Sequence, residues 1–324
     1  MDSPYHAATT TAGFVPLSRW TTVEATGRDR VTFLHNMCTN DVRGLEPGQG
    51  CEAFFTDVKG KIIGHAFLLA GGESVLLITV PDQAARLIAH LDRYVIREDV
   101  RLADKSADLV WTLAIGPQSE AMLARLAGGR TANFSTGWSH AWRPLGESQV
   151  LTARCELPWC GGWLIGAPTA VAEGFQRKLE GQGAAGCDDD VWRTVRIESG
   201  WPLLGVDFDG TNLPQEVARN QQAISFRKGC YLGQETVARI DAIGHVNRQL
   251  ATVRFRGGEP PPAGAELQSA GEVAGRVTSA CWSPAFAAPL ALAMMRRGKA
   301  ASGVELTCGE QMAEVVRTPA VTRR

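Results

Sequence analysis

The sequence lacks the signals of a membrane-spanning or secreted protein. No run of 18 apolar residues occurs in the 324-residue chain, and the longest candidate, Ala285 to Met295, is interrupted by Pro289. The N-terminus has no basic segment followed by an apolar block, so no secretory signal is expected. Acidic and basic residues nearly cancel, 34 against 33, which gives no reason to expect a polyanionic partner. We therefore expect a cytoplasmic protein that contacts no membrane.

The cysteines form none of the patterns that hold disulfides or metals. The eight are scattered along the chain at positions 38, 51, 155, 160, 187, 230, 281 and 308, with no C-x-x-C pair. Without a secretory context, a disulfide framework is not expected. His35 and Cys38 have helical spacing, but two ligands alone favour a core thiol and a surface imidazole over a metal site. No metal site is predicted.

The common nucleotide-binding and hydrolase motifs are missing as well. Gly60-Lys61 is followed by Ile62, where a P-loop needs Ser or Thr. No G-x-G-x-x-G follows a strand, and neither G-x-S-x-G nor H-E-x-x-H occurs. These absences exclude the usual dinucleotide, serine hydrolase and zincin classes.

Hydrophobic patterning predicts helices and strands in a first region and short strands in a second. Helical spacing is found over 29–38, 82–94, 118–127 and 188–201. Strand patterns cover 61–70, 74–80 and 109–115, the first two as a hairpin, whereas 133–167 is Trp-rich and irregular. After about residue 245, Gly/Pro clusters separate strand-like segments at 250–256, 265–268, 272–282, 290–297 and 303–307. This second pattern predicts a small, barrel-like β domain.

One carboxylate lies at the edge of an apolar helix face. The helix over 188–201 starts with three aspartates and ends at Gly200, as expected from the helix dipole and C-capping. Val191 and Val195 share a face, and Glu198 falls near its border. A partly buried carboxylate needs a partner. Either a salt bridge to a core arginine or contact with a ligand would provide one.

The most chemically suggestive segment is FRKGCYLGQETVAR at 226–239. Cys230 follows Lys228 and Gly229, and a helix is expected to begin near Gly233. Nearby cations favour the thiolate, and a glycine allows a tight turn that would present the sulfur. A nucleophilic or redox cysteine is one interpretation; a buried cysteine beside a turn whose cations face water is the other.

The string K-G-C-Y-x-G-Q-E at Lys228–Glu235, followed by Arg239, resembles the hallmark of the YgfZ-type folate-binding proteins linked to iron–sulfur cluster assembly. These proteins belong to the superfamily of the glycine-cleavage T-protein, an aminomethyltransferase. Further segments resemble that superfamily in the same order: F-L-H-N-M-C-T-N-D-V at 33–42, R-I-E-S-G-W-P at 196–202, P-Q-E at 214–216 and G-R-V-T-S-A-C-W-S-P at 275–284.

The resemblance implies an α+β, T-protein-like multi-domain arrangement around a central folate pocket, closed on one side by a small C-terminal β-barrel. Residues 1–244 would form the folate-binding region, as two interleaved α+β subdomains, and 245–324 the barrel. Tetrahydrofolate or a derivative would be the cofactor. Glu198 would hold the pterin, Arg227 would meet the cofactor's carboxylates, and Trp201 could stack on its flat ring.

The sequence departs from the T-protein pattern where the chemistry is expected. The T-protein's Asp-Asp pair is replaced within the segment Gly60–His65, and its acidic G-Y-T-G-E-D-G segment by Leu157–Gly162. Without those carboxylates aminomethyl transfer lacks its acid/base group and is disfavoured, so the sequence does not decide whether the chain is an enzyme. His65 sits at the vacated place; it is either an exposed histidine on an alternating strand or a replacement base.

The resemblance favours a folate-binding accessory protein that supports assembly or repair of iron–sulfur clusters, with transient contacts to the assembly machinery or to client enzymes. Cys230 would be its reactive group, poised by Lys228. Two alternatives are a folate-dependent one-carbon transferase that uses Cys230 or His65, and a factor acting in tRNA modification. The sequence has only short basic groups, such as Arg296-Arg297-Gly298-Lys299, and no basic stripe interleaved with aromatics, so direct nucleic-acid binding is not expected.

Overall fold

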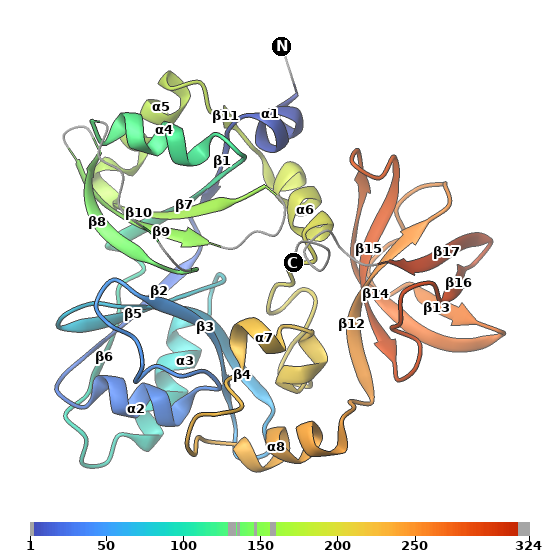
Figure 1. Cartoon of the computed structure of the whole chain (residues 1–324), viewed down its shortest axis with the longest axis horizontal. Coiled ribbons are helices and arrows are strands. Elements are labelled where there is room, and N and C mark those ends of the chain that lie inside the picture. Colours follow the sequence, from blue (N-terminus) through green and yellow to red (C-terminus); the bar gives the residue numbers. More distant parts are fainter. Residues whose placement is uncertain (1–2, 129–133, 135–136, 146–147, 156–159, 317–324) are drawn as a thin grey trace.

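The chain folds into two sheets with their covering helices and one closed barrel, seen in a computed structural model that describes residues 3–128, 134, 137–145, 148–155 and 160–316. Figure 1 shows the two sheets one above the other and the barrel beside them, with helix α6 (Asp189–Glu198) between the upper sheet and the barrel. Among the residues described, no helix combines the length and apolar character needed to cross a membrane. The α+β architecture with a C-terminal barrel, expected from the sequence, is confirmed.

The first sheet has six strands in the order β11-β1-β7-β10-β9-β8. Their bounds are Ala185–Gly186, Gly13–Leu17, Leu109–Ile115, Gly162–Pro168, Ser148–Cys155 and His140–Leu145. The helices that belong to this part are α1 (Pro4–Thr10), α4 (Ser119–Leu126) and α5 (Ala172–Gly181), with the short helix η2 (Thr169–Val171). The expected strand over 109–115 is confirmed as β7, at the centre of this sheet.

The second sheet has five strands in the order β3-β4-β5-β2-β6. Their bounds are Gly50–Thr56, Ile62–Ala70, Ser74–Thr79, Thr21–Thr26 and Arg101–Asp104. Its helices are α2 (Arg30–Met37), α3 (Ala84–Leu91) and η1 (Asp92–Tyr94). The predicted hairpin is confirmed, because β4 and β5 pair antiparallel.

One apolar core is shared by the two sheets and α6. Phe54 from β3, Trp111 from β7 and Trp192 from α6 belong to the same buried cluster. The two sheets therefore form one packed body, and burial of these large aromatic side chains stabilises it.

The barrel closes in the order β12-β15-β14-β13-β16-β17. Its strands are Arg248–Phe255, Ala288–Arg296, Glu272–Ser283, Glu266–Ser269, Glu305–Cys308 and Gln311–Val316. Five of these were expected from the sequence, and the sixth, β17, was missed. Pairing of β17 with both β12 and β16 closes the ring and leaves no open edge.

Three short helices connect the body to the barrel: η3 (Pro214–Val217), α7 (Asn220–Ala223) and α8 (Gln234–Ile243). The expected helix start near Gly233 is confirmed, because Gly233 precedes α8 directly. Its φ of 81° is left-handed, and a Cβ there would lie 2.3 Å from the carbonyl oxygen of Asp57. Glycine is therefore required at this position.

The sequence interpretation was wrong for the Trp-rich stretch 133–167. Two strands of the first sheet, β8 and β9, lie within it, and a third, β10, begins there and ends one residue beyond it. Gly162, Gly166 and Pro168 in β10 hide the strand pattern, because these residue types are depleted in strands. Tertiary pairing of β10 with β7 and β9 overrides that local preference.

Candidate functional site

Helix α6 places Glu198 in the interior. Its first residue follows Asp188, whose side chain accepts a hydrogen bond of 2.9 Å from the backbone N–H of Val191. Trp192 and Val195 are buried and hold the helix against the core. The last turn therefore carries Glu198 inward, to the region where the helix packs on β14 and β15 of the barrel (Figure 1).

The Glu198 carboxylate lies at the meeting point of three parts of the chain and is 1% exposed. The Tyr5 hydroxyl, from α1, lies 2.9 Å from both carboxylate oxygens. The Ser283 hydroxyl, at the end of β14, donates to one of them. Burial raises the pKa of Glu198, and the hydrogen bonds from Ser283 and Tyr5 offset part of that rise. A carboxylate can accept about four hydrogen bonds, and here the Tyr5 and Ser283 hydroxyls and the backbone of Ala285 supply the donors.

The core arginine next to this site pairs with a different acid. Arg196 Nη1 donates to Asp207 at 2.7 Å, and both side chains are almost fully buried. Asp207 also accepts from the hydroxyls of Thr278 at 2.7 Å and Ser279 at 2.6 Å, both on β14. One of the two sequence interpretations of Glu198 was a salt bridge to a core arginine. That interpretation is wrong, because no such salt bridge is found among the described residues. Asp207 instead ties the body to the barrel.

Trp201 lies three residues after Glu198 and is 4% exposed. Its ring meets Phe67 and Trp192 edge-on, with centroids 5.7 Å apart in both pairs. Its indole Nε1 is buried and has no hydrogen-bond partner among the described residues. A buried unpaired donor of this kind costs about 1–3 kcal/mol unless something accepts from it.

Lys228 is buried and serves the end of helix α2. Its ammonium donates to three carbonyl oxygens, those of His35, Cys38 and Asn40. Burial lowers the pKa of Lys228. A cation at these carbonyls complements the C-terminal end of the helix dipole. The geometry thus gives Lys228 a structural task, whereas the sequence suggested that it poises Cys230.

Cys230 and Arg227 are both exposed, in the segment between α7 and α8. The alternative of a buried cysteine is therefore wrong. The backbone of Gly229 is not left-handed, and a Cβ there would meet nothing within 4 Å. Contrary to the sequence interpretation, the tight turn in this motif is made by Gly233, not Gly229. Among the described residues, no hydrogen bond or ion pair joins Cys230 or Arg227 to Glu198.

His65 is buried rather than exposed, which corrects one of its two sequence interpretations. Its Nε2 lies 2.8 Å from a carboxylate oxygen of Glu52, on the adjacent strand β3. Arg219 forms a close two-nitrogen ion pair with the same carboxylate. Burial alone would raise the pKa of Glu52, but Arg219 and His65 outweigh it and lower the pKa to about 2. Glu52 therefore holds His65 in a set orientation.

Sequence reasoning missed Tyr5 and Ser283, whose hydroxyls bind the Glu198 carboxylate, because nothing in their local patterns marks them. It also took His35 as a surface imidazole, whereas His35 is 4% exposed. The expected replacement of an acidic segment at Leu157–Gly162 lies largely outside the described residues, which omit 156–159.

Comparison with known families agrees with this architecture. The chain matches the GCVT N-terminal domain over residues 2–228 and the glycine cleavage T-protein C-terminal barrel domain over residues 248–321. The crystal structure of glycine cleavage system aminomethyltransferase T from Bartonella henselae has a TM-score of 0.87, covering 99% of this chain and 89% of that chain. At 20% identity that likeness shows the fold alone.

Curated relatives show to which branch of this superfamily the chain belongs. A protein of Sodalis glossinidius (strain morsitans) named "tRNA-modifying protein YgfZ" is 32% identical over 260 residues, covering 78% of this chain and 75% of the relative. One of the same name from Yersinia pseudotuberculosis serotype O:1b (strain IP 31758) is 30% identical over 264 residues, covering 78% and 74%. The chain therefore belongs to the glycine-cleavage T-protein superfamily, and within it to the YgfZ type.

Proposed function

We propose that the chain binds tetrahydrofolate or a derivative in its interior, with Glu198 recognising the pterin. The observation that carries this is a buried carboxylate, whose pKa is raised by burial, where α1, α6 and the barrel meet. A pterin presents an amino group and a ring N–H side by side, and one carboxylate can accept from both.

Two further residues fit such a ligand. The unpaired indole N–H of Trp201 would find an acceptor in the nitrogens or carbonyl oxygen of a pterin ring. Arg227 is exposed and would meet carboxylates at the outer end of the cofactor. The bound folate would supply a one-carbon carrier, while the residues of this chain bind and orient it.

Calorimetric titration with tetrahydrofolate tests this proposal. Replacing Glu198 by Gln keeps the side chain's size but removes the charge and half of the acceptor capacity. We expect binding to weaken by about 2 kcal/mol or more, because a charged hydrogen-bond partner is lost. Glu266→Gln, which alters a barrel carboxylate paired with Arg276 at the surface, should bind like the parent. Equal affinity in all three proteins would contradict the role of Glu198.

We further propose that the folate-loaded protein acts as an accessory factor in assembly or repair of iron–sulfur clusters, with Cys230 as its reactive group. All eight cysteines lie in the described part of the chain, and of these Cys230 is exposed whereas the other seven are buried or half-buried. An exposed thiol on a surface segment is accessible to a partner protein, whereas the buried thiols are not. Arg227, also exposed, adds a cation to this surface.

A complementation assay addresses the thiol. In a strain that lacks this protein, a plasmid copy with Cys230→Ser should fail to restore the activity of an iron–sulfur enzyme. Cys308→Ser, at a half-buried cysteine in the barrel, should restore it. Full restoration by the Cys230 variant would remove the cysteine from the mechanism.

A second candidate function is a role in tRNA modification, because the curated relatives carry that name. The near-neutral charge of the chain favours an indirect role over direct RNA binding. Tight, salt-sensitive binding of tRNA by the purified protein would reverse that order. Turnover of a one-carbon folate with an amine or thiol acceptor would instead favour a transferase, in which the buried, Glu52-held His65 is the candidate base.

A further inference from the structure

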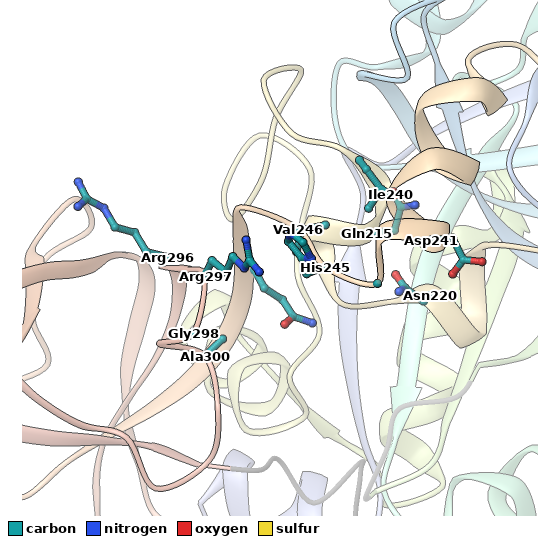
Figure 2. Close-up of a pocket in the computed structure, with 12 residues that line it drawn as sticks. Gln215, Asn220, Ile240, Asp241, His245, Val246, Arg296, Arg297, Gly298 and Ala300 are labelled. Carbon is teal, nitrogen blue, oxygen red and sulfur yellow. The ribbon is translucent and has the colours of Figure 1, made fainter.

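A cavity away from Glu198 lies at the junction between the body and the barrel. It has a volume of about 280 Å³ and lies between η3–α7, the end of α8 with the segment that follows it, and the turn after β15 (Figure 2). This is just below the usual range of small-molecule pockets, about 300–1,000 Å³. A small ligand, rather than a segment of another protein, suits this volume.

One end of the cavity carries acceptors that lack donors. Gln215 is 5% exposed, and its Nε2 donates to the carbonyl oxygen of Val237 at 2.7 Å. That bond orients the amide and leaves Oε1 buried without a partner among the described residues. Asn220 Oδ1 is likewise buried without a hydrogen-bond partner among the described residues, and both side chains line the cavity. Because a buried acceptor without a donor is costly, a ligand that brings N–H groups would relieve both.

The charges are separated along the cavity. Figure 2 shows Asp241 on the same side as Asn220, and Arg297 on the opposite side of His245. Arg297 and His245 are exposed, and within the described part of the chain neither forms an ion pair with a carboxylate. Arg296, its neighbour, points away from the cavity. The Arg297 end therefore suits an anion, and the Asn220 end suits a hydrogen-bond donor.

Between these ends the wall is apolar. Ile240, Val246 and Ala300 contribute it. A flat ring could lie against them while its edge donates to the amide oxygens. A ligand that fits this cavity has an anionic group, a flat ring and a hydrogen-bond donor on the edge of that ring. A nucleotide whose base carries an exocyclic amine has all three.

We propose that this cavity binds a nucleoside monophosphate with an amine-bearing base. Arg297 and His245 hold the phosphate, and Gln215 and Asn220 accept from the amine. This site is separate from the folate site and does not depend on it.

Calorimetric titration of the full chain with AMP, CMP, UMP and inorganic phosphate tests the proposal. AMP and CMP should bind at least tenfold more tightly than UMP, which lacks the exocyclic amine, and than phosphate, which lacks the base. No saturable binding of any of the nucleotides would overturn the proposal. Phosphate binding as tight as AMP binding would also overturn it, because the cavity would then be a simple anion site.

Three substitutions locate the binding. Arg297→Ala should weaken AMP binding at least tenfold, whereas Arg296→Ala, the matched control one residue away, should leave it within twofold. Asn220→Ala should erase the preference for AMP over UMP, and this side chain forms no hydrogen bond elsewhere among the described residues on which folding would depend. Equal losses from both arginine variants would overturn the proposal in favour of general surface attraction.

Discussion

Replacing Arg219 by Met is expected to lower the free energy of unfolding by about 3–5 kcal/mol. The change leaves the Glu52 carboxylate, whose side chain is completely buried, without its counter-charge. His65 donates one hydrogen bond to the same carboxylate, but one bond from a histidine does not replace a two-nitrogen guanidinium contact. Urea unfolding followed by circular dichroism measures the loss.

The same pair predicts a pH dependence. Glu52 has a folded-state pKa of about 2, below the ordinary value of 4.5. Its contribution to stability is therefore complete above about pH 4.5 and is lost as the pH falls toward 2. The difference in stability between the parent and the Arg219→Met variant should shrink as the pH falls. In the variant, protonation of Glu52 removes the unpaired buried charge, and in the parent it removes the contribution of the ion pair.

Two controls separate this effect from general damage. Arg19→Met removes the same side chain from an ion pair with Asp82 in which both partners are more than 70% exposed, and should cost less than about 1 kcal/mol. Combining Arg219→Met with Glu52→Gln should recover part of the loss, because no lone charge then remains buried. Losses of equal size for Arg219→Met and Arg19→Met would contradict a stabilising buried pair.

Asp207→Asn is expected to be comparably destabilising, at about 3–5 kcal/mol, and to loosen the barrel from the body. The substitution leaves the Arg196 guanidinium buried without a counter-charge. It also weakens the acceptor for Thr278 and Ser279 of the barrel. Besides urea unfolding, limited proteolysis should show earlier cleavage near residues 244–247, between α8 and β12.

Asp190→Asn is the matched control for this prediction. Asp190 pairs with Arg193 on the same helix, α6, but both side chains are about half or more exposed. We expect its effect to stay below about 1 kcal/mol, with unchanged cleavage. If Asp207→Asn behaved like Asp190→Asn, the buried carboxylate would not be what attaches the barrel.

The local hydrophobic pattern was sufficient to predict a helix or strand where that element is long and regularly apolar. The segment 109–115 has this character and became β7 without a change of bounds. The Asp-rich start and glycine end of the segment 188–201 likewise set the limits of α6. Pattern failed for β10, whose glycines and proline oppose the strand, and for β17, whose role is to close a ring. Both errors arise because strand pairing is a contact between distant segments.

In the candidate site, too, some residues could be predicted from the sequence and others only from the structure. Position on a helix face marked Glu198 as a buried carboxylate in need of a partner, before any contact was known. Its partners, Tyr5 and Ser283, lie 193 and 85 residues away, so no local pattern could name them. The position of Lys228 near Cys230 in the sequence suggested that it lowers the pKa of that thiol. In the fold its ammonium instead donates hydrogen bonds to the carbonyl oxygens at the end of α2.

The order of residues thus predicted several of the helices, the position of the barrel, the superfamily that its motifs resemble and the carboxylate that needs a partner, but it missed α1 and α5. Each of these depends on periodicity, capping or motif spacing within a few tens of residues. Folding decided which charges meet, as in the pairs Glu52–Arg219 and Arg196–Asp207, and which cavity holds acceptors without donors. The physical reason is that desolvation and hydrogen bonding depend on what packs around a group in space, not on its neighbours in the chain.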